Sequence, residues 1–279
     1  MVKEVSFLKN TSTRRKERID KLLVLKGLFE SREKAQRALM AGLVFVDGKR
    51  IEKAGDKVDP DANIEVKGSG CPYVSRGGLK LKKALDYFSI SLEGKTCLDI
   101  GASTGGFTDC MLKEGARKVY AVDVGYGQLH WSLRKDPRVE LRERTNARYL
   151  SREVIPEPID FFAIDVSFIS VKKILPAVEG LLDEKAEGVI LVKPQFEAGR
   201  KWVKGGVVRS EEIHEMVVRD VVDFTLRELK LNPLNLTYSP IKGPKGNIEF
   251  LLYVGFREPS LREEMISSVV REAHERLGD

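Results

Sequence analysis

The stretch that decides the fold of this chain is residues 98–107, LDIGASTGGF, in which an apolar strand leads into a glycine-rich turn and the start of a helix. Glycines at such a turn let the backbone approach a nucleotide-like ligand closely. Asp123 ends the next predicted strand, where a carboxylate can accept hydrogen bonds from ribose hydroxyls. A dinucleotide fingerprint of the form GxGxxG would require a glycine at the position of Ser103. The stretch therefore predicts a cofactor with a ribose and no phosphate cradle; the alternative is a glycine turn kept for packing.

Strands and helices alternate on both sides of this turn. Apolar runs predict strands over residues 96–100, 119–124, 139–142, 161–166 and 189–193, and helical periodicity predicts helices over 79–88, 107–113, 171–182 and 211–229. Two more strands, near 236–239 and 248–254, follow with no helix between them, and a helix closes the chain. This order is typical of an α/β fold with a doubly wound, mostly parallel sheet, here with one antiparallel edge strand.

The carboxyl ends of the strands are where such sheets bind their ligands. The predicted cofactor contacts are therefore the glycine-rich turn, the end of the second strand, and the loops after the third and fourth strands. These residues are Gly101, Ala102, Ser103, Thr104, Gly105, Gly106, Phe107, Asp123, Val124, Asn146, Ala147 and Asp165.

Two lysines and two carboxylates are predicted at the same edge of the sheet. A lysine whose pKa is lowered by burial or by a second cation can act as a base near neutral pH. Alternating carboxylates keep two lysines close together and oriented. Such a set can align and activate a hydroxyl group for an in-line methyl transfer. The candidate catalytic residues are Lys80, Asp165, Lys193 and Glu249.

The N-terminal quarter of the chain is basic. Residues 1–68 hold ten Lys and six Arg against eleven Asp and Glu, so they carry +5 of the net charge of +6. Helical periodicity covers 17–42, and strands follow at 43–50 and 58–66, the first containing an Asp47-Gly48 turn typical of a hairpin. A basic segment before a nearly neutral body favours an anchor for an anionic polymer. The alternative is a solvated basic surface with no partner.

The same segment resembles the S4 domain, an RNA-binding module. The resemblance lies in RIDKLL at 18–23, SREKA at 31–35 and AGLVFVDGK at 41–49. It implies a small α+β domain that contacts structured RNA mainly at phosphates. The implied RNA contacts are Arg14, Arg15, Arg18, Arg32, Lys34, Arg37, Lys49 and Arg50. We expect this domain at residues 1–68, a linker at 69–74 and the large domain at 75–279.

The four charged residues resemble the Lys-Asp-Lys-Glu set of FtsJ-type ribose methyltransferases, which have a Rossmann-like sheet and use S-adenosylmethionine. With the S4 domain in front, the chain is similar to the TlyA, or hemolysin-A-like, family from about residue 15 to residue 256. The specific stretches are VSRGG at 74–78, the turn at 101–107, DVSFIS at 165–170, VKPQFE at 192–197 and GPKGNIE at 243–249. The resemblance implies 2′-O-methylation of ribosomal RNA at cytidines. It assigns activation of the hydroxyl to Lys193, with Asp165 and Lys80 shaping the site and Glu249 supporting it.

Residues 199–209 combine four basic residues with Trp202 and a Gly205-Gly206 pair. A basic loop with an aromatic residue can close over RNA and stack on a base, or it can be a disordered surface loop. We predict that the RNA contacts of the large domain are Arg76, Lys201 and Lys204.

Other chemistries and protein classes fit the sequence less well. Methylation of an exocyclic amine is typical of an Asn/Asp-Pro-Pro-aromatic segment, where this chain has DVSF at 165–168. Methylation of a pyrimidine at carbon 5 needs a cysteine nucleophile, but Cys97 and Cys110 fall in predicted core elements and Cys71 in the linker. From other classes, the alternatives are a non-catalytic RNA-binding or ribosome-assembly factor and a membrane-active haemolysin.

Composition bears on location and on metals. Three cysteines without a CxxC pair, and three histidines that form no cluster, predict neither a disulfide framework nor a metal site. No signal sequence is visible, and no apolar run approaches the ~20 residues that cross a bilayer. We expect a cytoplasmic protein whose partners are ribosomal RNA or ribosomal subunits; its oligomeric state is not indicated by the sequence.

Overall fold

The computed structural model of the protein describes residues 16–26, 28–29, 31–40, 42–66 and 71–278. The chain divides into two compact units, Met1–Cys71 and Pro72–Asp279. Tyr73 is buried against Gly78, and the Val74 N–H donates to Asp109 Oδ2 at 2.8 Å. Because of these contacts, the last residues of the predicted linker are part of the second unit.

The first unit is a small α+β domain built around an apolar cluster that includes Ile19, Leu23, Leu39 and Val44. Its three-stranded antiparallel sheet has the order β3-β2-β5, and β1 pairs with β4. The predicted hairpin is confirmed: Asp47 and Gly48 have φ angles of 48° and 77°, the left-handed conformation that a two-residue turn requires. Its elements are β1 (Glu17–Arg18), α1 (Ile19–Leu25), α2 (Arg32–Met40), β2 (Val44–Val46), β3 (Lys49–Ile51), β4 (Lys57–Val58) and β5 (Ile64–Val66).

A buried carboxylate ties the two helices of this unit together. Asp20 is fully buried and accepts hydrogen bonds from Arg18, from Arg32 at 2.8 Å and from Gln36 at 2.9 Å. The hydrogen bonds from Arg18 hold the pKa of Asp20 well below its usual range. Both arginine side chains stay about half exposed, at 46% and 53%.

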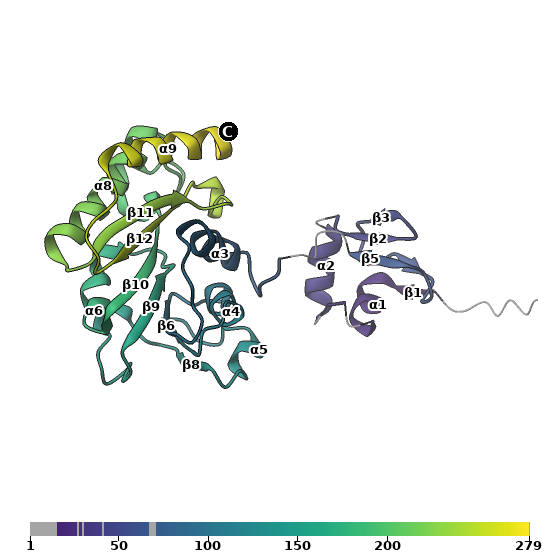
Figure 1. Ribbon diagram of the computed structural model, residues 1–279. Helices are drawn as coiled ribbons and strands as arrows, with labels where there is room; N and C mark the ends of the chain where they lie inside the picture. The colour runs from purple at the N-terminus through teal and green to yellow at the C-terminus, as the bar shows by residue number, and fades with distance from the viewer. Residues whose placement is uncertain (1–15, 27, 30, 41, 67–70, 279) are drawn as a thin grey trace, which may run out of the picture. The chain divides into compact units, whose positions relative to one another are not determined.

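The second unit is built on a seven-stranded sheet with the order β11-β12-β10-β9-β6-β7-β8 (Figure 1). Strands β10, β9, β6, β7 and β8 are parallel to one another, as predicted, and β12 runs antiparallel to both of its neighbours, β10 and β11. The strands are β6 (Thr96–Ile100), β7 (Lys118–Val122), β8 (Val139–Arg142), β9 (Ile159–Ile164), β10 (Leu182–Val192), β11 (Asn232–Tyr238) and β12 (Phe250–Gly255).

The position predicted for the antiparallel strand was wrong. β12 lies one place in from the edge, and β11 is the edge strand. The sequence of β12, FLLYVG, is buried at every position, which suits a strand with neighbours on both sides. β11 begins with Asn232-Pro233. Proline has no N–H to donate to a neighbouring strand, so within sheets it is confined to places such as edge strands and the starts of strands.

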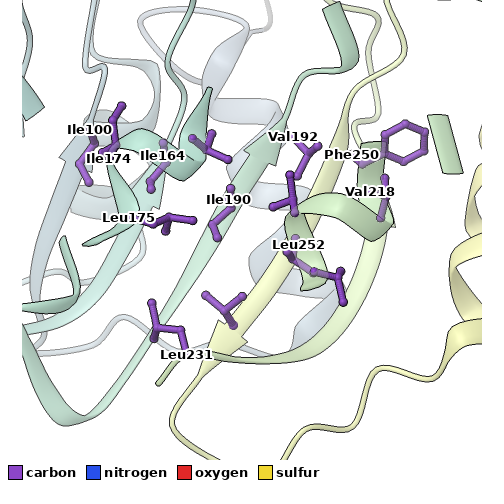
Figure 2. Close-up of a cluster of buried hydrophobic side chains, with 14 of the residues drawn as sticks. Ile100, Ile164, Ile174, Leu175, Ile190, Val192, Val218, Leu231, Phe250 and Leu252 are labelled. Atoms are coloured by element: carbon purple, nitrogen blue, oxygen red, sulfur yellow. The ribbon is translucent and has the colours of Figure 1, made fainter. Parts of the chain in front are cut away.

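Helices cover both faces of this sheet, with α3 and α4 on one face and α6 and α8 on the other (Figure 1). In the main apolar cluster, residues that lie side by side on neighbouring strands, such as Ile100, Ile164 and Ile190, pack with Leu175 of α6 and Val218 of α8 (Figure 2). The helices are α3 (Gly77–Phe88), α4 (Gly106–Lys113), α5 (Trp131–Arg134), α6 (Leu175–Glu179), α7 (Pro194–Glu197), α8 (Glu211–Glu228) and α9 (Glu263–Leu277).

The helix predicted over residues 171–182 is shorter than expected. A 3-10 turn at Val171–Lys173 precedes α6, which ends at Glu179, and β10 already begins at Leu182. Pro176 lies in the first turn of α6, and proline is tolerated at the start of a helix but not in its interior. The predicted helix therefore covers two separate elements. In the described part of the chain, no helix combines the length and apolar character that crossing a membrane requires.

Candidate active site

The sheet places the ends of four strands at one edge. Ile100, Ile164 and Ile190 are register partners across the parallel strands β6, β9 and β10, so the residues that follow these strands emerge together. β12 is antiparallel and therefore begins where the others end, with Phe250 opposite Val192. β6 lies between β9 and β7, the point where the chain order reverses and where such sheets bind ligands.

At two positions the glycine-rich turn after β6 runs so close to its neighbours that a side chain has no room. Gly101 has a φ of 86°, and a Cβ there would lie 2.4 Å from the carbonyl oxygen of Asp165. Gly105 has a φ of 97°, and a Cβ there would lie 2.3 Å from Leu133. The turn therefore needs glycine for both its conformation and its close packing.

Asp123 organises the loops beside this turn. Its carboxylate accepts hydrogen bonds from the backbone N–H groups of Ser103 and Gly125, each at 2.7 Å. Beneath the turn, Asp99 is fully buried in β6 and accepts a hydrogen bond from Thr108 Oγ1 of α4 at 2.6 Å. Burial raises the pKa of Asp99 to about 7. Asp123 thus joins the turn to the loop after β7, and Asp99 joins β6 to α4.

Two adjoining cavities open at this edge. One, of about 510 Å³, includes Asp123, Val124, Asn146 and Ala147 in its lining. The other, of about 590 Å³, includes Ala102, Thr104, Gly106 and Phe107. Gly101, Ser103 and Asp165 line both cavities. The structure thus brings together the predicted cofactor contacts except Gly105, which packs against Leu129 and Leu133 and lines neither cavity.

The four candidate catalytic residues meet as two lysine–carboxylate pairs. Lys193 Nζ lies 2.5 Å from Asp165 Oδ1, and Lys80 Nζ donates to Glu249 Oε2 at 2.6 Å. Lys80, Lys193 and Glu249 are buried, with exposed fractions of 7%, 6% and 0%. Lys80, Asp165 and Lys193 line the 590 Å³ cavity.

Glu249 has a further feature of interest. Its Oε1 is buried and has no hydrogen-bond partner among the described residues. Gly243 lies so close that a Cβ there would be 2.1 Å from that oxygen. A buried carboxylate oxygen without a partner is costly, so the burial of Glu249 depends on its ion pair with Lys80.

Two residues of the site were missed in the sequence analysis. Ser167 Oγ lies 3.1 Å from Lys193 Nζ and accepts a hydrogen bond from it. Phe168 has a φ of 65°, is 90% exposed, lines the 510 Å³ cavity and lies 5.1 Å from the ring of Phe196. A left-handed phenylalanine with an exposed ring is a strained feature that often marks a functional site. No local signal announces it, because exposure and backbone conformation depend on the surrounding loops.

The prediction that the histidines form no cluster was wrong for two of them. His214 Nδ1 of α8 lies 2.8 Å from His274 Nε2 of α9, and His214 Nε2 lies 3.2 Å from the carbonyl oxygen of Val208. Burial lowers the pKa of His214 to about 4. The pair joins two helices that are far apart in sequence, which no sequence spacing could indicate.

The predicted RNA contacts are distributed over both units. In the first unit Arg37, Lys49 and Arg50 are exposed, and Lys34 is half-buried. In the second unit Arg76, Lys201 and Lys204 are exposed, and Arg76 lines the 590 Å³ cavity. Arg14 and Arg15 lie outside the described residues.

The sheet order, the glycine turn at the reversal point and the aspartate after β7 define the class of Rossmann-like, S-adenosylmethionine-dependent methyltransferases. Comparison with known proteins identifies the family. The chain belongs to the FtsJ-like methyltransferase family, whose model matches residues 73–256, and an S4 domain matches residues 17–64.

Relatives extend over nearly the whole chain. A Bacillus subtilis (strain 168) protein provisionally named rRNA methyltransferase YqxC is 50% identical over 95% of this chain and 96% of its own length. The 16S/23S rRNA (cytidine-2′-O)-methyltransferase TlyA of Mycobacterium tuberculosis (strain ATCC 25618 / H37Rv) is 45% identical over 86% of this chain and 90% of its own length. A solved structure from Streptococcus thermophilus, of a protein provisionally named a hemolysin, is 46% identical, covers 94% of this chain and 97% of its own, and superposes with a TM-score of 0.75.

Proposed function

We propose that this protein transfers a methyl group from S-adenosylmethionine to a ribose 2′-hydroxyl of ribosomal RNA in the cytoplasm, with cytidine as the target nucleotide. The observation that carries the proposal is the pair of lysine–carboxylate contacts, Lys193–Asp165 and Lys80–Glu249, beside the glycine-rich turn. The name of the Mycobacterium tuberculosis relative supports the choice of reaction and of cytidine. The S4 domain supports RNA as the substrate.

The residues at the edge of the sheet fit the cofactor. The turn at Gly101 has no side chain to obstruct a ligand, and Asp123 presents a carboxylate beside the 510 Å³ cavity. In this proposal Asp123 holds the ribose hydroxyls, Asn146 and Ala147 contact the adenine, and Asp165 contacts the methionine end. When bound, S-adenosylmethionine supplies an electrophilic methyl group on a positively charged sulfur.

Lys193 acts on the hydroxyl oxygen of the substrate. Its side chain is held by Asp165 and Ser167, so the Nζ group is already positioned at the wall of the cavity before the substrate binds. The oxygen forms its bond to the methyl carbon as the carbon–sulfur bond breaks, and the hydroxyl proton is lost to water. A buried cation beside the oxygen stabilises the partly anionic oxygen that forms as the proton leaves, more strongly than water does. Lys80, held by Glu249, adds a second cation to the wall. The two carboxylates keep the two ammonium groups oriented.

The proposal is tested by methyl transfer from labelled S-adenosylmethionine to ribosomal subunits from cells that lack this protein, followed by nucleoside analysis. We expect label in a 2′-O-methylated cytidine. A base-methylated nucleoside would overturn the chemistry, and tight cofactor binding without transfer to either subunit would overturn ribosomal RNA as substrate. The absence of cofactor binding would favour a non-catalytic RNA-binding factor.

Replacing Asp123 by alanine is expected to weaken S-adenosylmethionine binding about 10- to 150-fold, since a hydrogen bond to a charged group contributes about 1.5–3 kcal/mol. The variant also loses the carboxylate that holds the N–H groups of Ser103 and Gly125. Calorimetric titration measures the affinity. Asp136→Ala is the matched control, because Asp136 pairs with Arg138 and lines neither cavity. Equal affinities of the two variants would remove Asp123 from the cofactor site.

A further inference from the structure

The basic loop at residues 199–209 is ordered by specific contacts. It begins with a 3-10 turn at Arg200–Trp202, followed by a tight hairpin in which the N–H groups of Lys204 and Val207 each donate to the other's carbonyl oxygen at 3.1 Å. Gly205 and Gly206 have φ angles of 62° and 85°, as a two-residue hairpin turn requires. The loop is therefore a defined element of the second unit.

Asn247 fastens this hairpin to the wall of the 590 Å³ cavity that holds Lys80 and Lys193, called the catalytic cavity below. It is 2% exposed, its amide donates to the carbonyl oxygen of Gly206 at 2.9 Å, and its Oδ1 accepts from the N–H of Val208 at 3.2 Å. The same amide donates to the carbonyl oxygen of Pro244, which lines the 590 Å³ cavity. The position of the loop is thus tied to the position of the active site.

A separate cavity of about 700 Å³ opens on this loop. Its apolar part is formed by Val207, Val208 and Ile213, and the side chain of Trp202 lies beside them with 41% of its surface exposed. A volume of this order suits a small planar ligand, and an exposed tryptophan ring offers it a surface for stacking.

Cations surround that apolar surface. Lys201, Lys204 and Arg209 line the cavity, and Lys201 Nζ lies 4.8 Å from the centre of the Trp202 ring. The one carboxylate in the lining, Glu212, accepts a hydrogen bond from Ser210 Oγ. The cavity therefore joins an aromatic platform to a surplus of positive charge.

A chain of hollows links this cavity to the active site. An intermediate cavity of about 470 Å³ shares Val207, Val208 and Arg209 with the 700 Å³ cavity. It shares Lys242 and Lys245 with the catalytic cavity. In the intermediate cavity three basic residues face two carboxylates, Glu211 and Glu275. Lysine or arginine lines each of the three cavities, so a polyanion can follow them from the active site to Trp202.

We propose that the 700 Å³ cavity at Trp202 binds an unpaired nucleotide of the substrate RNA, a few nucleotides from the one that is methylated. The base stacks on Trp202, and the phosphates lie against Lys201, Lys204 and Arg209. Stacking of bases on an aromatic side chain beside a basic groove is how proteins bind single-stranded RNA. An acidic peptide would be drawn by the same cations, but it would not require the exposed indole ring. The inference rests on the proposed function only in taking RNA as the substrate.

The chain's two tryptophans, Trp131 and Trp202, allow a local test. In the full-length Trp131→Phe variant, fluorescence reports Trp202 alone. We expect quenching by a single-stranded RNA oligonucleotide and none by an abasic oligonucleotide of the same length. Equal quenching by the abasic strand, or quenching only by a poly-glutamate peptide, would overturn the proposal, because neither carries a base.

Affinity gives a second and independent measure. Stacking contributes about 1–3 kcal/mol per base, so Trp202→Ala is expected to raise the KM for ribosomal subunits about 5- to 150-fold with kcat unchanged. Trp202→Phe should recover most of the affinity, and Trp131→Ala, which also removes an exposed tryptophan, should not change it. An unchanged KM in Trp202→Ala would overturn the proposal. If wild-type protein methylates neither subunit but RNA still quenches Trp202, the proposed function fails and the nucleotide site stands.

Discussion

Replacing Lys193 by alanine is expected to lower the rate of methyl transfer by about 10²–10⁴-fold, the range that a positioned group acting on a reacting proton or charge contributes. Lys193 is buried at the cavity wall and held by both Asp165 and Ser167. Lys80, the second cation of the wall, is held by Glu249. Cofactor affinity should stay within a few-fold of wild type, because the turn at Gly101 and the carboxylate of Asp123 are unchanged. Single-turnover transfer to ribosomal subunits measures the rate, and titration measures the affinity.

The control for this variant is Lys185→Ala. Lys185 is an exposed lysine near the start of β10, the same strand that ends before Lys193, so it lies at the opposite edge of the sheet. It should transfer methyl groups at the wild-type rate. Lys193→Met tests whether shape alone is sufficient, since methionine keeps the length of the side chain without its charge. If Lys193→Ala and Lys193→Met both turn over within a factor of ten of wild type, Lys193 has no catalytic role.

Removing Lys80 is expected to have the largest effect on stability. Lys80→Ala leaves the carboxylate of Glu249 fully buried with neither of its oxygens paired. Breaking a buried ion pair in this way costs about 3–5 kcal/mol in the free energy of unfolding. Both tryptophans belong to the second unit, so urea unfolding followed by their fluorescence reports the stability of that unit.

The double variant Lys80→Met/Glu249→Gln separates stability from activity. It removes both charges while keeping similar volumes, and such replacements are often close to neutral in stability. We expect it to recover most of the lost stability but not methyl transfer. Lys82→Ala is the matched control on the same helix, because the Lys82 side chain is 37% exposed and its pairs with Asp86 and Glu114 contribute at most about 1 kcal/mol each. A double variant with wild-type activity would contradict the role proposed for this pair.

Much of the fold followed from local patterns in the sequence. Apolar runs and helical periodicity indicated the parallel strands, and the glycines at 101 and 105 indicated a turn that only glycine can form. The Asp47-Gly48 hairpin was equally readable, because its backbone conformation is a property of two adjacent residues. Patterns of this kind depend on a few neighbouring residues, so they predict a local element whatever the arrangement of the elements in the fold.

The sequence also placed the four charged residues at one edge, because parallel strands end together. It did not say which lysine pairs with which carboxylate. Lys80 and Glu249 are 169 residues apart, and they meet because α3 lies over the face of the sheet near β12. The insertion of β12 between β10 and β11 likewise could not be predicted from local sequence patterns. The same holds for the contact of His214 with His274.

By itself, then, the sequence determined the two domains' types, the glycine turn and the set of residues at the edge of the sheet. The tertiary structure decided the pairing of Lys193 with Asp165, the unpartnered oxygen of Glu249 and the cavity at Trp202. The reason is physical. Periodicity and turn conformation depend on neighbours along the chain, whereas burial, ion pairing and cavities depend on strand order and on segments that meet only after folding.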